Sequence, residues 1–238
     1  MKIAIMQPYF FPYIGYFQLI NLVDKWIIFD TPQYIRHGWV NRNKIIHPND
    51  GSQYIIVPLK KHSRNISIKD VQVNNDQNWK ERILGQLMHY KKKAKYFNET
   101  YDLISECFDI DVNSLSKLNI FILERVCRFL DINFNYQFFS EMTINIESIS
   151  HPGDWALFIS NELKAREYIN PPGGVDLFEP AKFAELGIKL NFIYPGEIIY
   201  QQGSKKNFIS NLSIIDILMW NSKHEIKKML NQFALKAK

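Results

Sequence analysis

The chain has 238 residues, 46% of them hydrophobic and 14% aromatic, a composition that excludes a disordered protein and is enough for a buried core. It has no apolar run of about eighteen residues, and its apolar N-terminal stretch is too short for a secretory signal, so we expect no membrane span and no leader. The net charge is +5, and the basic residues are spread out apart from residues 60–61, residues 91–93 and the C-terminal tail, which favours phosphorylated small molecules over nucleic acid as partners. Two cysteines make neither a disulfide framework nor a metal site, and we expect a protein of the reducing cytoplasm.

The first thirty residues predict a βαβ unit. Residues 2–6 are an apolar run with the length of a buried strand, and two prolines in residues 7–15 prevent that strand from continuing. Residues 15–23 have helical spacing, and residues 26–29 form a second apolar run. A crossover of this kind implies parallel strands joined by a right-handed connection.

The next segment alternates polar loops with short strands. Residues 31–45 form a long loop with turn residues, aromatic rings and basic side chains, and part of it is extended. We predict strands at residues 53–59 and 66–73, with a second basic loop between them. A polar loop that directly follows the carboxyl end of a strand is a favourable place for a binding site.

The middle of the chain reads as helical. Apolar residues recur at spacings of three and four in residues 76–90, 96–108 and 112–130. Cys107 and Cys127 fall on these apolar faces and are expected in the core.

Shorter βα patterns follow the helical region. They comprise extended segments at 134–139 and 142–146, a helix from 151 to 163, strands at 168–170 and 188–193, and polar groups at a strand edge near 198–202. A helix at 214–220 opens with a capping box formed by Ser213 and Asp216, and a basic helical tail starts at Lys223.

These patterns predict an α/β fold with a mostly parallel, Rossmann-like sheet and a helical insertion. We divide the chain into an N-terminal βα segment (1–75), a helical subdomain (76–131) and a C-terminal βα segment (132–238). In open α/β sheets, ligands bind beyond the carboxyl ends of the strands. Gln7 and Asp30 both lie at such ends, and we expect them to be catalytic, with Asp30 better placed as a base than His37, His62 or His89.

The loops at the same rim supply the residues expected to bind substrate. Prolines and glycines shape these loops, aromatic rings provide walls, and Arg36 and Arg42 can make forked hydrogen bonds to phosphate. The expected binding residues are Tyr9, Pro12, Gly15, Tyr16, Gln33, Arg36, Trp39, Asn41, Arg42, Asn170, Gly173, Gly174, Tyr200 and Gln201. A structural role fits Gln7, Tyr9, Tyr16 and Asp30 as well as a functional role does. For Phe10 and Phe11, packing of the first loop is favoured over function.

Several of these motifs together resemble the WbqC-like protein family. They are residues 6–17, Asp30, Gln33, residues 39–42, residues 168–170 with Gly173 and Gly174, Tyr200 with Gln201, and residues 212–216. The resemblance runs nearly end to end. It implies a cytoplasmic protein of O-antigen and surface polysaccharide biosynthesis that modifies a nucleotide-linked amino sugar, by transfer of an aminoacyl group such as glycyl to the sugar amine.

Residues 12–16 are also similar to the first loop of nucleotidylyl transferases and pantothenate synthetases, where a His-x-Gly-His signature binds ATP phosphates. Tyr13 and Tyr16 stand at the positions of the two histidines, and tyrosine cannot supply positive charge. Three classes of function therefore remain open: an acyl or aminoacyl transferase, a ligase or nucleotidylyl transferase that uses ATP with Mg²⁺, and a nucleotide-sugar binding protein without catalysis.

Overall fold

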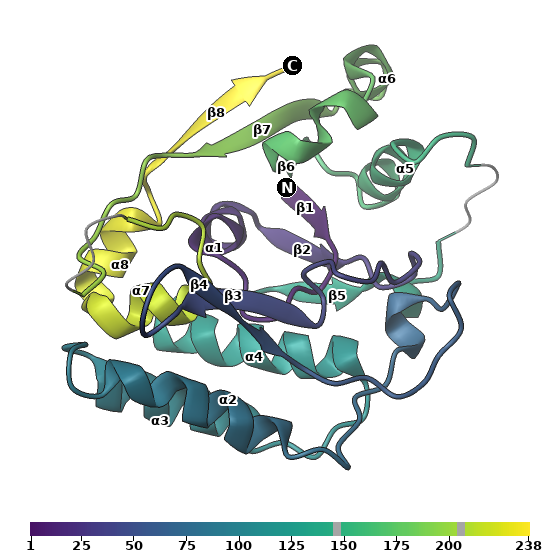
Figure 1. The fold of residues 1–238 in the computed structure, drawn as a ribbon. Helices are drawn as coiled ribbons and strands as arrows, with labels where there is room; N and C mark the ends of the chain where they lie inside the picture. Colours follow the sequence, from purple (N-terminus) through teal and green to yellow (C-terminus); the bar gives the residue numbers. More distant parts are fainter. Residues whose placement is uncertain (145–148, 204–207) are drawn as a thin grey trace.

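The structure is a computed structural model that describes residues 1–144, 149–203 and 208–238. Its centre is a six-stranded sheet in the order β5-β2-β1-β6-β7-β8 (Figure 1). The strands are β1 (Lys2–Met6), β2 (Lys25–Ile28), β5 (Tyr136–Phe138), β6 (Glu167–Asn170), β7 (Lys189–Pro195) and β8 (Phe233–Ala237). All neighbours are parallel except β7 and β8, which are antiparallel. The parallel strands, numbered along the chain, have the order 3-2-1-4-5 of doubly wound nucleotide-binding sheets, which confirms the expected Rossmann-like fold.

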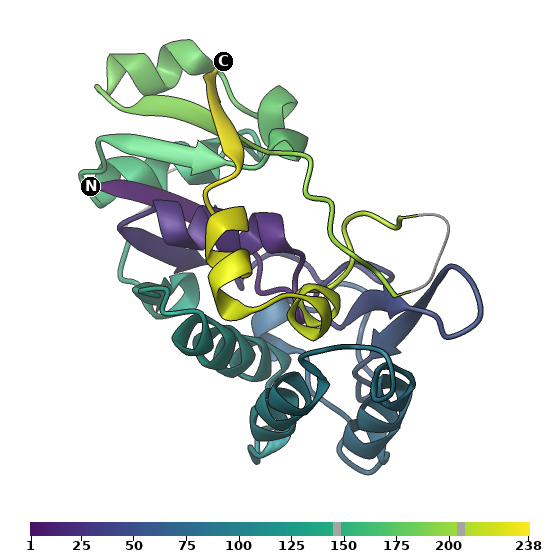
Figure 2. The same ribbon diagram turned by 90° about the vertical axis from the view of Figure 1, so that its left-hand side faces the viewer.

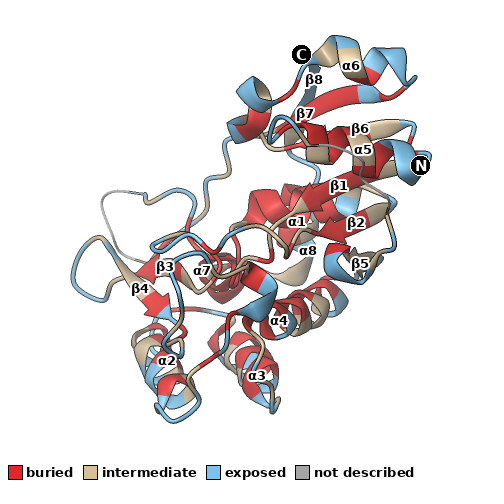
Figure 3. Ribbon diagram, turned by 90° about the vertical axis from the view of Figure 1, so that its right-hand side faces the viewer, coloured by how far each residue is buried: buried red, intermediate tan, exposed pale blue. Residues whose placement is uncertain are grey.

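Both faces of the sheet are buried, and the strand sequences show why. Side chains alternate between faces along a strand, so an apolar run fills two cores at once. Ile3 and Ile27 belong to one hydrophobic cluster, whereas Ala4 and Ile28 belong to the other. Figure 3 shows the central strands as the buried middle of the molecule, with exposed residues on β8 at the edge.

Helices cover the two faces in separate groups. The helices are α1 (Ile14–Leu22), α2 (Trp79–Leu87), α3 (Phe97–Phe108), α4 (Leu115–Phe129), α5 (Asp154–Glu162), α6 (Pro180–Glu185), α7 (Ile214–Trp220) and α8 (Lys223–Met229). Apolar residues of α1 and α4 pack in the first cluster, and those of α5 and α6 pack in the second. The helices α2 and α3 form an outer layer beyond α4 (Figure 1).

The predicted helical region, residues 76–131, contains α2, α3 and α4. These helices share one hydrophobic cluster with α1 and the sheet. The division of the chain at residues 75 and 131 stays a prediction. No helix in the described ranges is both long enough and apolar enough to cross a membrane.

A separate antiparallel hairpin lies beside the main sheet. Its strands are β3 (Arg42–Ile46) and β4 (Ser52–Ile56), and Gly51, with φ of 67°, lies in the turn between them. The predicted strand at 53–59 corresponds to β4, which pairs only within this hairpin.

Several local predictions are wrong or only partly right. Residues 66–73 form no strand, because Ile68 begins a 3-10 turn (Ile68–Asp70), Val71 directly follows it, and both side chains are buried. Residues 198–202 form no strand of their own but belong to an irregular segment shortly after the end of β7. The tail is helical only to Met229, since residues 233–237 instead pair with the free edge of β7 as β8.

The predicted extended segment at 142–146 lies partly outside the described residues. Residues 142–144, which are described, form no strand. Figure 2 shows that the chain leaves the sheet after β7, and residues 208–213 lead into α7. Residues 197–200, 208 and 210–212 thereby lie around the same cavity as the loop that follows β1.

Candidate functional site

A cavity of about 920 Å³ opens at the carboxyl end of the sheet. Its walls come from the loop after β1, the loop after β6 and the irregular segment after β7, together with Trp39 and Asn43. The strands β1 and β6 are neighbours from which the chain winds in opposite directions, so this is the topological switch point of the sheet. Ligands of doubly wound proteins bind at that point, which makes this cavity the candidate site.

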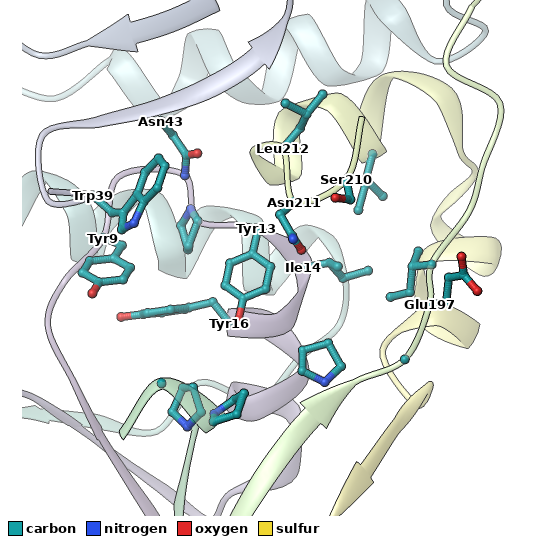
Figure 4. A pocket seen from close by; sticks show the side chains of 18 of the residues that line it. Tyr9, Tyr13, Ile14, Tyr16, Trp39, Asn43, Glu197, Ser210, Asn211 and Leu212 are labelled. Carbon is teal, nitrogen blue, oxygen red and sulfur yellow. The ribbon is translucent and has the colours of Figure 1, made fainter. Parts of the chain in front are cut away.

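Aromatic rings form one side of the cavity. Figure 4 shows Tyr9, Tyr13, Tyr16 and Trp39 together on that side, with Glu197 across from them. The rings of Tyr9 and Tyr16 lie 5.7 Å apart, and the Tyr16 hydroxyl donates a hydrogen bond to the Gln7 carbonyl oxygen at 2.7 Å. Burial raises the pKa of Tyr9, Tyr13 and Tyr16, so all three remain neutral phenols at physiological pH.

Two buried amide side chains hold the backbone of the loop after β1, which carries Tyr9 and Tyr13. Asn43 Nδ2 donates to the carbonyl oxygens of Phe10 and Phe11 at 3.1 and 2.8 Å. Asn119 Nδ2 donates to the carbonyl oxygens of Pro8 and Val40 at 2.9 and 2.7 Å. Because each amide satisfies two backbone acceptors in the core, the loop has a fixed shape before any ligand binds.

Gly15 and Phe11 make this shape possible. A Cβ on Gly15 would lie 2.4 Å from the ring of Tyr13, so only glycine lets that ring reach the cavity wall. Phe11 has a φ of 38° and lies fully buried beside Phe10, with the two rings 5.0 Å apart. The expectation that these two phenylalanines pack the loop is confirmed.

The charge of the cavity wall is unusual for a protein with a basic sequence. Among the described lining residues, Glu197 has the only charged side chain, and none is Lys, Arg or His. The other polar groups there are hydroxyls and amides such as Ser210 and Asn211. This wall suits a neutral or cationic group with flat apolar faces.

Positive charge concentrates instead on two loops next to Trp39. Residues 31–41 and 58–69 contain no acidic residue and five basic ones: Arg36, Lys60, Lys61, Arg64 and Lys69. Their net charge of +5 equals that of the whole chain. The loops contact one another, since Gln33 pairs with Ser67 and the Tyr34 amide donates to the Ile66 carbonyl oxygen at 2.8 Å. We call residues 31–41 and 58–69 the basic loops.

Six of the predicted binding residues line the cavity: Tyr9, Pro12, Tyr16, Trp39, Gly173 and Tyr200. Trp39 joins the cavity to the basic loops and is 39% exposed. The guanidinium of Arg42 lies over the Tyr54 ring at 4.3 Å and donates to the carbonyl oxygens of His37 and Gly38. Gln33, Arg36 and Gln201 are exposed outside the lining.

The remaining predicted binding residues have structural contacts. Asn41 accepts a hydrogen bond from the Tyr34 hydroxyl and donates to the Val57 carbonyl oxygen. Asn170 accepts from the Tyr168 hydroxyl at 2.9 Å, and a Cβ on Gly174 would lie 2.2 Å from its Nδ2. These contacts stabilise the loops around the cavity.

The two residues expected to be catalytic also lie outside the cavity lining. The buried carboxylate of Asp30 accepts hydrogen bonds from the backbone amide and hydroxyl of Ser140, at 3.0 and 2.6 Å. It thereby ties the loop after β2 to the end of β5. Gln7 contributes its carbonyl oxygen to Tyr16. A catalytic role for either residue stays a prediction.

Asp216 is a functional candidate that sequence reasoning missed, because its position predicted a helix cap. Asp216, expected to close a capping box, is completely buried, and the N-cap of α7 is made by Ser213 Oγ, which accepts from the Ile215 amide. The Asp216 carboxylate instead accepts hydrogen bonds from the hydroxyls of Tyr90 and Tyr200, each at 2.6 Å. An acidic residue inside the apolar run 214–219 was the available signal.

The fold and the cavity define a doubly wound α/β protein with a preformed cavity at its switch point. The chain belongs to the WbqC-like protein family, whose model matches residues 7–228. It is 28% identical over 226 residues to the uncharacterized protein Rv1507c of Mycobacterium tuberculosis, and the match covers 91% of this chain and 92% of that protein. No solved structure matches the chain significantly.

Proposed function

We propose that this protein is a cytoplasmic transferase that modifies a nucleotide-linked amino sugar in surface polysaccharide biosynthesis. The reaction is the transfer of an aminoacyl group such as glycyl to the sugar amine. The observation that carries the proposal is the aromatic cavity at the switch point, which adjoins the basic loops through Trp39.

The charge distribution suggests where each part of such a substrate would bind: the sugar in the aromatic cavity and the nucleotide near the basic loops. A sugar ring presents C–H faces that pack on aromatic rings, and Tyr9, Tyr13 and Tyr16 offer both ring faces and neutral hydroxyls. An amino group on the sugar could pair with Glu197 across the cavity.

The nucleotide would lie towards the basic loops. A diphosphate carries negative charge, which favours Arg36 and Arg64 over the cavity wall. The indole of Trp39 lies between the two regions and offers a stacking face to a nucleobase.

Amide formation needs three things from the site: a group that accepts the proton of the amine, donors for the developing oxyanion, and an activated acyl donor held close to the amine. The phenols and amides of the lining are suitable oxyanion donors. Proton acceptors near the cavity are Glu197 and the carboxylate behind Tyr200.

A second candidate function is an ATP-dependent ligase or nucleotidylyl transferase. The strand order 3-2-1-4-5 and the position of residues 12–16 after β1 favour it, since nucleotide-binding sheets share both. Against it stands the absence of a cationic side chain among the described lining residues. A third candidate function is binding of the nucleotide-sugar without catalysis.

Calorimetric titration with a panel of ligands separates these functions. We expect UDP- or dTDP-linked amino sugars to bind more tightly than their N-acetylated forms, because acetylation removes the charge that faces Glu197. Tight binding of ATP with Mg²⁺ and none of a nucleotide-sugar would contradict the proposal and favour the ligase. Conversion of an amino sugar nucleotide in the presence of glycine and ATP, detected by mass spectrometry as an added glycyl group, then distinguishes catalysis from binding.

A further inference from the structure

The buried Asp216 carboxylate has no cationic partner among the described residues, although it lies just behind the cavity wall. Its Oδ1 accepts from the Tyr90 hydroxyl at 2.6 Å. Its Oδ2 accepts from the Tyr200 hydroxyl at 2.6 Å and from Gln202 Nε2 at 3.2 Å. A carboxylate in the core is normally paired with a cation, and here only neutral donors satisfy it.

One of these donors belongs to a residue that lines the cavity. Tyr200 lines it, whereas Tyr90 does not and accepts instead from the Ile46 amide on β3. Among the described residues, the Tyr200 hydroxyl donates to Asp216 Oδ2 at 2.6 Å and accepts from Gln202 Nε2 at 2.9 Å. A phenol oxygen can accept as well as donate, so an amine proton that reaches it from the cavity would share this oxygen with Gln202 Nε2.

We propose that Tyr200 and Asp216 form a proton-accepting pair for the cavity. This inference rests on the proposed function. As the substrate amine forms its bond to the acyl carbon, one amine N–H bond breaks and its proton moves to the Tyr200 oxygen. The proton that Tyr200 held moves to Asp216 Oδ2, and the acyl donor's leaving group departs with the electrons of its bond to carbon. Tyr200 is then the catalytic residue, and Asp216 a positioning residue that acts through it.

The surroundings suit this direction of transfer. Burial raises the pKa of Asp216, although the hydrogen bonds from Tyr200 and Tyr90 oppose the rise. Burial, together with the nearby Asp216 charge, also raises the pKa of Tyr200. A free tyrosinate is therefore disfavoured, whereas a concerted shift leaves Tyr200 neutral and places the proton on the group whose environment favours it.

A purely structural role is the competing explanation, because Gln202 also binds the backbone of Ile209 through both ends of its amide. Comparing Tyr200→Phe with Tyr90→Phe separates the two. Each variant removes one 2.6 Å hydrogen bond to the same carboxylate, but only Tyr200 faces the cavity. Tyr136→Phe is the control, since Tyr136 donates to Glu124 at 3.0 Å outside the cavity lining.

The assay is steady-state turnover of a UDP-linked amino sugar with a preformed activated donor, a glycyl thioester whose thiol is the leaving group, and in parallel with glycine and ATP, after wild-type binding is established by calorimetry. We expect Tyr200→Phe to lower kcat about 100-fold or more with little change in KM, as for loss of a general base. Tyr136→Phe should keep wild-type kcat, and Tyr90→Phe should lose far less than Tyr200→Phe. The double variant Tyr200→Phe/Asp216→Asn should lose no more than Tyr200→Phe alone, because the residues act as a unit.

Equal losses of kcat in Tyr200→Phe and Tyr90→Phe would overturn the inference and leave the proposed function standing. So would wild-type kcat in Tyr200→Phe, a variant that keeps the ring and remains informative if Asp216→Asn does not fold. If the wild-type protein neither binds nor converts any amino sugar nucleotide, the proposed function fails first and the inference fails with it.

Discussion

Asn43 offers a direct test of whether the aromatic cavity is held from within the core. Its side chain is almost fully buried and donates to the carbonyl oxygens of both Phe10 and Phe11. Asn43→Ala leaves the Phe10 oxygen without this donor, whereas the Phe11 oxygen keeps the hydroxyl of Ser213 at 2.8 Å. A buried polar group that loses its partner costs ~1–3 kcal/mol, so we expect a loss of about 2 kcal/mol in the free energy of unfolding.

The measurement is urea denaturation followed by fluorescence, with thermal unfolding as a second reading. For a chain of this size, 2 kcal/mol corresponds to a fall of about 4–8 °C in Tm. Asn135→Ala is the matched control, because Asn135 Nδ2 makes one exposed hydrogen bond, to the Asp24 carbonyl oxygen at 3.0 Å. We expect that control to stay within about 0.5 kcal/mol of wild type.

Binding provides the second half of the test. If the amide holds Tyr9 and Tyr13 in place, Asn43→Ala should also weaken binding of the nucleotide-sugar. An Asn43→Ala variant as stable as the Asn135→Ala control would refute the idea that this side chain fixes the loop.

Three further predictions concern the cavity, the basic loops and the thiols. Trp39→Ala should weaken binding of a nucleotide-sugar about 5- to 100-fold by calorimetry, the range that loss of one stacking ring gives, and unchanged affinity would exclude Trp39 from the site. Arg36→Ala combined with Arg64→Ala should weaken the same binding about tenfold at low salt and flatten its salt dependence, whereas Arg125→Ala on α4 should change neither. Burial raises the pKa of Cys107 to about 12 and also raises that of Cys127, so thiolate forms only as pH rises towards these values. Both thiols should resist a disulfide reagent at pH 8 in the folded protein and react once guanidinium unfolds it; rapid reaction of the native protein would contradict their burial.

The opening of the chain was the most predictable part of the fold. Runs such as residues 2–6 and 26–29 became β1 and β2, and the prolines of the first loop ended β1 where expected. These features depend on neighbours in sequence: apolar periodicity selects the element, and proline or glycine ends it. The three helices between residues 76 and 131 followed from the same rule.

The spacing of apolar residues was misleading where tertiary contacts chose between local structures. Residues 66–73 alternate like a strand, yet Ile68 and Val71 reach the core through a 3-10 turn because the backbone of Val71 pairs with Leu115 at the start of α4. Residues 233–237 form a strand because they pair with the free edge of β7. Nothing in the sequence of the tail itself indicates that this edge is available.

The chain by itself determined that a rigid aromatic loop follows the first strand and that basic residues gather shortly after the second. Only the tertiary structure decided which polar side chains face the cavity. The Asp30 carboxylate accepts a hydrogen bond from Ser140, 110 residues away, and the Asp216 carboxylate accepts one from Tyr90, 126 residues away. Hydrogen bonds over such distances along the chain depend on how the elements pack, so a carboxylate that reads as a helix cap in sequence can become the buried partner of a cavity tyrosine.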